Sequence, residues 1–448
     1  MRQLAGTLLM LGLIVPTHAL ALNLNDAWKT LQAQGPRYQA AIHEREATQE
    51  ERAIGRANLL PTVTLSAQAN RNDGSLTQPD ISGQEVRSDI DHNSWSATAQ
   101  LRQPLYDPQG MAGYRQGQHR ADEGLAVFDS RHQELAILLA ERYLDALLAR
   151  ESLALSERKL DAFDQQLRAA ERRFDTGEGT IIDVDQARAS RDLTQAELLE
   201  AENQLRLSRY QLQELLAAPV PDIATLSEAF PTPGLTPTTL EAWLALARRD
   251  SPNVVARRVG LLIAEEETRI ARAGRLPTLG LVLGYTTNES SSLTTVDQQQ
   301  QYGWIGLELN LTLYSGGMTS ARIRQSDQRR EGAYQVLGAT QQEIATLTAR
   351  EFHNIQSSQA RLRALELAVA SSERAVESTR RGFQAGSSTN LDILNEEENL
   401  FTARRDLLQA RIDYLLSRMR LAAVAGELDD DEFEFVNGYL GESATLDV

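Results

Sequence analysis

The sequence predicts a mixed fold in which a duplicated helix–strand–strand–helix repeat combines long α-helices with transmembrane β-strands. Three observations predict it. A short motif recurs at a fixed spacing in the two halves of the chain. Each half also contains two stretches in which apolar and polar residues alternate, as in strands with one apolar face. A helical pattern of about 65 residues, or roughly 100 Å, follows each pair of stretches.

The recurring motif surrounds two breaks in the helical pattern. Each of its residues in the first half lies 209 positions before its counterpart in the second (383 − 174 = 209). The counterparts are Phe174 and Phe383, Gly177 and Gly386, Thr180 and Thr389, and Asp183 and Asp392. Glycine favours the end of a helix, and threonine followed three residues later by an acid favours the start of the next. We therefore expect two tight helical hairpins, with tips near residues 175–181 and 384–390.

The first residues and the composition limit the class of protein. Residues 1–21 are typical of a secretory signal peptide, with Arg2 before an apolar core and an A-x-A motif at Ala19–Ala21. No later run approaches about 18 apolar residues, so we expect any membrane crossing to use strands. The formal net charge of −17 argues against nucleic acid as a partner. The sequence contains no cysteine, which excludes disulfides and thiolate sites.

The first repeat is expected to span residues 22–218. It begins with a helical pattern that Gly35–Pro36 interrupts. Two amphipathic membrane strands follow at 62–70 and 94–106, and the polar segment between them, 71–93, is expected to be a loop. Two long helices then flank the first tip, and apolar residues at steps of seven predict coiled-coil packing between helices.

The second repeat has the same order. A proline-rich segment, 219–237, predicts a rigid linker, and the repeat itself is expected at 238–426. Its strands are predicted at 278–286 and 302–314, and long helices flank the second tip. The acidic segment 427–448 is expected to be a solvated tail.

The strands determine what the chain must assemble into. One amphipathic hairpin also fits a soluble protein, but the second pair and the export signal favour a membrane barrel. Glu308 lies on the polar face of its strand and would need water. Four strands cannot close a barrel, and an open edge in lipid leaves backbone groups without partners. Because eight strands leave little lumen, we expect three chains to form an open twelve-stranded barrel.

The sequence resembles the TolC family of outer-membrane efflux and secretion channels over nearly the whole chain after the signal. The resemblance is sharpest in RRFDTGEGTIIDVDQARA and RRGFQAGSSTNLDILNEEENL, and it extends to the closing helix ARIDYLLSRMRLAAVAGEL. It is closest to the members that serve protein secretion of the type I kind and general efflux. The resemblance implies a homotrimer in outer-membrane lipid, a twelve-stranded barrel and a long helical barrel in the periplasm. It also implies a periplasmic adaptor (membrane fusion protein) and an inner-membrane pump of the ABC, RND or MFS class.

The resemblance also assigns candidate site residues. Asp392 matches an aspartate of the family's periplasmic entrance, whereas the second entrance acid is Asn395 here. The family's tyrosine and arginine latch positions are Phe383 and Ser388, and the acid that they bond is Asp183. The entrance and gate residues are Asp392, Asn395, Asn399, Asp183, Phe383 and Ser388. The adaptor-docking tips contain Gly177, Gly179, Thr180, Gly386, Ser387 and Thr389. Alternatively, Asp392 and Asp183 act only as helix-capping acids.

Three function classes remain. The first is an export conduit of a tripartite efflux or type I secretion system, passing small molecules or unfolded protein. The second is a structural or adhesive trimeric coiled coil, and the third is a passive porin-like channel. We find no catalytic motif and expect neither an enzyme nor a cofactor. The histidines lack metal-ligand spacing, and the run Glu396–Glu398 is expected to be a solvated face rather than a metal site.

Overall fold

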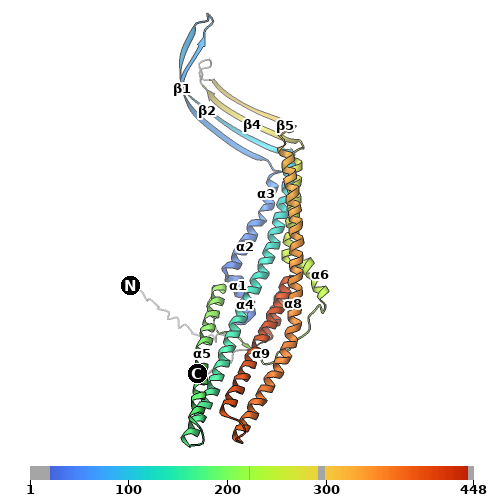
Figure 1. Cartoon of the computed structure of the whole chain (residues 1–448). Helices are drawn as coiled ribbons and strands as arrows, with labels where there is room; N and C mark the ends of the chain where they lie inside the picture. Colours follow the sequence, from blue (N-terminus) through green and yellow to red (C-terminus); the bar gives the residue numbers. More distant parts are fainter. Residues whose placement is uncertain (1–20, 221, 291–297, 442–448) are drawn as a thin grey trace, which may run out of the picture. The chain divides into compact units, whose positions relative to one another are not determined.

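The computed structural model describes residues 21–220, 222–290 and 298–441 (Figure 1). The predicted signal peptide lies outside this range except for Ala21, and so do residues 442–448 of the predicted tail. The chain divides into two compact units. Of the described residues, those within Ile42–Ser130 and Pro252–Ile344 form one unit, and those up to Ala41, within Arg131–Ser251 and from Ala345 onward form the other. Across the described part of the chain, none of the helices combines the length and the apolar character that a membrane span requires.

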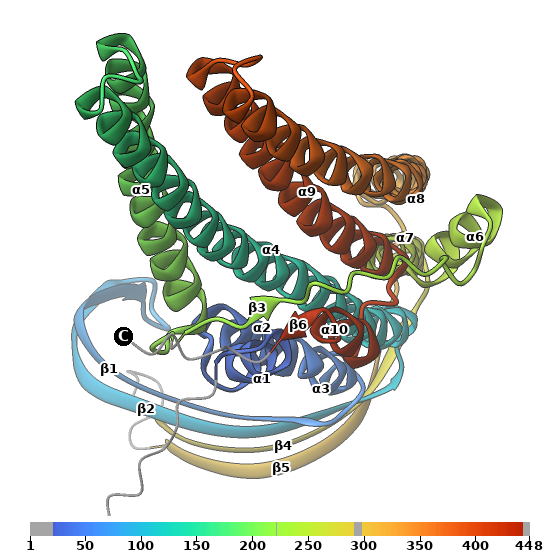
Figure 2. The same ribbon diagram turned by 90° about the horizontal axis from the view of Figure 1, so that it is seen from below.

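Four long helices carry most of the chain. They are α4 (Pro108–Asp175), α5 (Ile181–Leu216), α8 (Met318–Gln384) and α9 (Asn390–Ala425). The first and third contain 68 and 67 residues, and the other two contain 36 each, so the two halves have helices of matching length. Figures 1 and 2 show α4 beside α5 and α8 beside α9, each pair joined at a tip.

Shorter helices precede the strands of each half. They are α1 (Leu24–Gln34), α2 (Pro36–Gln49), α3 (Glu51–Ala57), α6 (Leu240–Asp250) and α7 (Pro252–Ala273). The predicted interruption at Gly35–Pro36 is confirmed, because α1 ends before Gly35 and Pro36 begins α2. Pro252 begins α7 in the same way. Proline suits this first position because its missing N–H would have no partner within the helix.

The strands form one curved antiparallel sheet with the order β1-β2-β4-β5 (Figures 1 and 2). The strands are β1 (Thr62–Pro79), β2 (Glu85–Tyr106), β4 (Thr278–Ser290) and β5 (Gln298–Asn310). The register places Leu65, Ala99 and Tyr285 in one row across β1, β2 and β4. This row belongs to an apolar face, on which Leu65 and Ile305 are 78% and 71% exposed. The alternation in the sequence thus becomes a sheet with two chemically different faces.

Several predicted strand boundaries are wrong. Strand β4 continues to Ser290 instead of residue 286, and β5 begins at Gln298 instead of residue 302. Segment 71–93 is not a loop, because β1 and β2 continue as a paired ribbon and turn only at Asp80–Gln84. Polar side chains can face water on both sides of a ribbon while the backbone remains hydrogen-bonded, so polarity alone does not indicate a loop. The last strand ends at Asn310 instead of residue 314. Its next partner would be Pro277, which has no N–H to donate.

The predicted solvated tail is also wrong for its described part, because α10 (Asp430–Asn437) buries apolar side chains. Phe433 is fully buried and stacks on Trp28, with 5.0 Å between ring centroids. The carboxylate of Asp429 accepts hydrogen bonds from the first N–H groups of α10. Phe433 and Val436 lie three residues apart, so they share one face of a short amphipathic helix among acidic neighbours.

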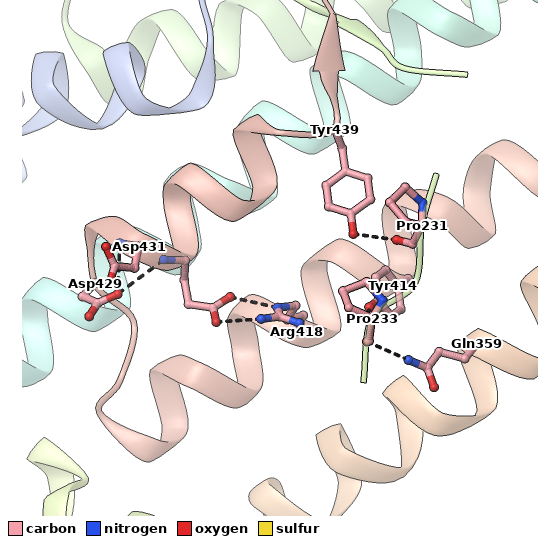
Figure 3. Close-up of polar contacts among 9 residues, drawn as sticks. Pro231, Pro233, Gln359, Tyr414, Arg418, Asp429, Asp431 and Tyr439 are labelled. Carbon is pink, nitrogen blue, oxygen red and sulfur yellow. Dashed lines mark hydrogen bonds and ion pairs between the residues drawn. The ribbon is translucent and has the colours of Figure 1, made fainter. Parts of the chain in front are cut away.

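The C-terminal segment also holds the proline-rich linker against α9. Tyr439 and Tyr414 donate hydroxyl hydrogen bonds to the carbonyl oxygens of Pro231 and Pro233, at 2.6 and 3.3 Å (Figure 3). Arg418 on α9 donates two hydrogen bonds of 3.0 Å to the carboxylate of Glu432. The two-residue strands β3 (Thr225–Leu226) and β6 (Leu440–Gly441) pair in the same region. Linker, α9 and C-terminal segment therefore form one packed structure.

We predict that Phe433→Ala lowers the free energy of unfolding by about 3 to 5 kcal/mol, because it removes a fully buried aromatic ring and leaves a cavity. Chemical denaturation in detergent measures this change. Asp430→Ala on the exposed side of α10 is the control and should cost less than about 1 kcal/mol. Equal stability of the two variants would contradict the packing role of α10.

Candidate functional site

The two tips have the same backbone geometry. In the first, the N–H groups of Gly177 and Glu178 donate to the carbonyl oxygens of Phe174 and Arg173. In the second, Gly386 and Ser387 donate in the same way to Phe383 and Gly382. Both central glycines have positive φ angles, +79° and +77°, a conformation that strains residues with a side chain. The duplicated motif therefore specifies two equivalent turns.

A capping box begins the helix after each tip. The carboxylate of Asp183 accepts hydrogen bonds from the N–H and hydroxyl of Thr180, at 3.0 and 2.7 Å. Asp392 accepts the same two bonds from Thr389, at 2.7 and 2.8 Å. The alternative prediction, that both acids cap helices, is thus confirmed as a local role. These bonds hold the pKa of the exposed Asp392 below its usual range, so this carboxylate stays charged to a more acidic pH than an ordinary aspartate.

The first hairpin also contacts the second. The guanidinium of Arg173 lies 4.1 Å from the centre of the Phe383 ring, in a cation–π contact. Gln166 donates to the side-chain oxygen of Asn390 at 2.6 Å, and the Asn390 amide donates to the backbone oxygen of Asp183 at 3.3 Å. Asn390 is only 3% exposed, so its polar groups depend on these partners. We call Gln166, Arg173, Asp183, Phe383 and Asn390 the tip contact.

A cavity of about 230 Å³ separates parts of the two hairpins near the tip contact. Among the predicted site residues, Gly179, Asp183 and Phe383 line it. Asp392, Asn395 and Asn399 are exposed on α9 and do not line it. Ser388 is half-buried beside Gly382, where an added Cβ would come within 2.6 Å of the serine hydroxyl. The other tip residues, Gly177, Thr180, Gly386, Ser387 and Thr389, are exposed.

Sequence reasoning missed three residues of the tip contact: Gln166, Arg173 and Asn390. The duplication could have indicated Arg173 and Asn390, because each differs in residue type from its counterpart in the other copy. The counterpart of Arg173 is Gly382, and the counterpart of Asn390 is Ile181. Such a difference indicates that the two counterpart residues lie in different surroundings. Asn390 is buried and hydrogen-bonded, whereas Ile181 is 51% exposed.

A buried lysine joins the hairpins farther from the tips. The side chain of Lys159 on α4 is 9% exposed, and its Nζ lies 2.7 Å from Glu197 on α5 and 2.8 Å from Glu398 on α9. Glu397 is also buried and pairs with Arg380 on α8. The prediction of a solvated face at Glu396–Glu398 is therefore wrong for Glu397. Within each ion pair, each charged side chain depends on its partner, because removing one of them leaves the other as a buried, poorly hydrated charge. Within the described ranges, no group of acidic and histidine side chains is placed to hold a metal ion.

Comparisons with known proteins agree with this architecture. The family model described as "Outer membrane efflux protein" matches residues 28–218 and 243–427. The alkaline protease secretion protein AprF of Pseudomonas aeruginosa is 34% identical over 95% of this chain and 88% of its own length. The proteases secretion protein PrtF of Dickeya chrysanthemi is 31% identical, over 92% of this chain and 90% of its own.

A solved structure shows the same fold. The crystal structure of the outer membrane protein VceC from Vibrio cholerae superposes with a TM-score of 0.76. The match covers 91% of this chain and 97% of VceC at 19% sequence identity, so it supports the fold alone. The two matched segments of the family model contain both tips and all four long strands. The chain belongs to the outer membrane efflux protein family.

Proposed function

We propose that the protein is the outer-membrane exit duct of a type I secretion system and that its cargo is unfolded protein. The family supports an export duct of the outer membrane, and the relatives AprF and PrtF are named for the secretion of proteases. A tripartite efflux system with small-molecule cargo is the second candidate, because the family name itself describes efflux. In either system the chain is a conduit and no catalytic step is assigned to it.

The names of the relatives support the protein cargo, and the observation that carries the membrane duct is the sheet, which has an apolar face, a polar face and two open edges. Apolar side chains such as Val63 and Leu307 are 72% and 68% exposed, a large cost in water and a favourable arrangement against lipid. Within the described residues, the outer edges of β1 and β5 have no strand beside them. In lipid these edges need partners, and three copies of the sheet supply them by closing a twelve-stranded barrel.

The helices extend this duct into the periplasm. Each copy brings two hairpins of matching length, so three chains bring six hairpins to a common entrance. The duplication supports such an arrangement, because two similar hairpins can occupy equivalent places in a ring of six. A structural or adhesive coiled coil would use the helices but leaves the two-faced sheet without a role. A passive porin would use the sheet but leaves roughly 100 Å of helix without one.

We predict that the purified protein is a trimer in native mass spectrometry and forms ion-conducting channels in planar lipid bilayers. Both follow from barrel closure by three sheets. A trimer without conductance would favour the adhesive coiled coil. A stable, folded monomer in detergent would contradict the barrel.

The entrance is proposed to lie at the tips, where three copies of Asp392 would face a common axis. Asn395 and Asn399 share its side of α9 at the spacing of helical turns. Asn395 carries no charge, so Asp392 supplies the negative potential on this face. The tip contact takes the place of a latch: Phe383 is held by Arg173, and Asp183 accepts from Asn390 through its backbone oxygen. Ser388 lies beside Gly382, and the hydroxyl of the adjacent Ser387 donates to the Gly382 carbonyl oxygen at 3.1 Å.

We predict that Asp392→Asn lowers and Asn395→Asp raises the preference of the channel for cations, each by about twofold in permeability ratio. The Asp392→Asn variant removes the charge but keeps an oxygen that can accept from Thr389, so it separates the pore role from the capping role. Reversal potentials in a salt gradient measure the effect. Asp430→Asn on α10 removes an equal charge away from the tips and serves as control. If both tip variants match the wild type, Asp392 is only a capping acid.

The exposed turns of the tips are proposed to dock a periplasmic adaptor coupled to an inner-membrane pump of the ABC, RND or MFS class. We predict that Gly386→Val weakens adaptor docking, because valine cannot adopt the positive φ of this turn without strain. In vivo cross-linking from a cysteine at Ser387 measures docking. Ala385→Val creates the same side chain one position earlier, just after α8, without a positive φ, and it should dock normally. Normal docking and export by Gly386→Val would contradict the assignment.

A further inference from the structure

An ion pair crosses the polar face of the sheet. Arg102 on β2 and Glu308 on β5 lie on opposite sides of β4, and Nη1 of Arg102 is 3.0 Å from Oε2 of Glu308. The register aligns Arg102 with Val282 and Glu308 with Gly280, so the contact runs diagonally across β4. Asn310 donates to the other oxygen of Glu308 at 2.6 Å. The carboxylate is thus held by residues of β2 and β5 together.

Two glycines on β4 lie beneath side chains of the neighbouring strands. A Cβ added at Gly280 would lie 3.9 Å from Nε of Arg102, so the arginine passes close over a residue without a side chain. Four residues along, the Trp304 ring lies over Gly284, where an added Cβ would come within 2.4 Å of the ring. The two glycines share one face of β4. Large side chains of the neighbouring strands therefore lie flat on this face instead of projecting from it.

The pair belongs to the face that must contact water. Arg102 and Glu308 keep 45% and 41% of their side chains exposed in the single chain. Thr98 and Thr286, which share their face, contact each other through their hydroxyls at 3.1 Å. Charged groups in hydrocarbon are costly, whereas the opposite face is rich in exposed leucine and isoleucine. If the apolar face contacts lipid, the polar face lines the lumen.

We propose that the Arg102–Glu308 pair keeps the wall of the lumen electrically neutral at the end of the sheet that joins the helices. The proposal rests on the channel function proposed above. Three chains would place three such pairs around one lumen, each contributing no net charge. Loss of one partner would leave three like charges facing a shared water-filled space, where their potentials add. A neutral wall suits a polypeptide cargo with charges of both signs, because it attracts neither the acidic nor the basic side chains of the cargo.

The experiment measures the K⁺/Cl⁻ permeability ratio from reversal potentials of the whole trimer in a KCl gradient. Glu308→Gln leaves Arg102 without its partner and should shift the ratio toward Cl⁻ by about twofold or more. Arg102→Gln should shift it toward K⁺ by a similar factor. The double variant should return to the wild-type ratio, because it carries neither charge. Low salt should enlarge both single shifts, since the charges are then less screened.

The chain offers a matched control on the other face. Arg71 and Asp91 form a similar ion pair between β1 and β2, 3.3 Å apart, at alternate positions that continue the apolar face. Arg71→Gln and Asp91→Asn should leave the permeability ratio unchanged. The swapped pair Arg102→Glu with Glu308→Arg restores neutrality and provides a second test if the single variants fail to assemble as trimers.

Single variants that conduct with the wild-type ratio, or that shift it in the same direction, would overturn the role of the pair while leaving the channel function intact. A swapped pair that does not restore the ratio would overturn it as well. A wild-type trimer without conductance would instead refute the proposed function, and the pore-lining role with it.

Discussion

A strand in hydrocarbon needs a hydrogen-bonding partner along both edges, and the rest of this molecule can be understood from that requirement. The sheet satisfies it internally for β2 and β4, which have strands on both sides. In the proposed barrel, β1 and β5 depend on other copies of the chain. Their edges are separated in the sequence by two long helices and a linker, so the proposed assembly would also fix how many hairpins meet at the entrance. In that proposal, the number of strands per chain determines the number of hairpins around the entrance.

The duplication gives the two tips the same local structure, and positions at which the two copies differ contribute to the tip contact. The turn and the capping box are the same in both tips, because each depends only on nearby residues. The tip contact depends on residues that differ between the copies, such as Arg173 opposite Gly382 and Asn390 opposite Ile181. One hairpin therefore presents a cation, and the other presents an aromatic ring and a buried amide. Contacts of this kind give neighbouring hairpins a defined order that two identical copies could not specify.

Sequence patterns predicted those parts of the fold that depend on interactions between residues close in the chain. The long helices, the helix break before Pro36 and both tips follow from periodicity, proline and capping residues. The sequence indicated β1 and β2 where apolar and polar residues alternate. Their extension through 71–93 lacks this alternation, because both faces of that ribbon are exposed to water. The helix α10 is short and acidic, and only its contact with Trp28, about 400 residues away in the chain, reveals its apolar face. Arg102 could not be paired with Glu308 without the order of the strands.

The contact of α10 with α1 has a consequence for biogenesis. The N–H of Leu24 donates to the side chain of Asn437, which lies 413 positions later in the chain. Folding rates fall as the sequence separation of native contacts rises, and this separation is almost the length of the chain. Helix α1 also contacts α5, and Trp28 packs on His132 of α4, but the contacts of α1 with α10 form only when both ends of the chain are present. This unit is therefore complete only after residues separated by more than 400 positions have met, so its last contacts are expected to form late in folding.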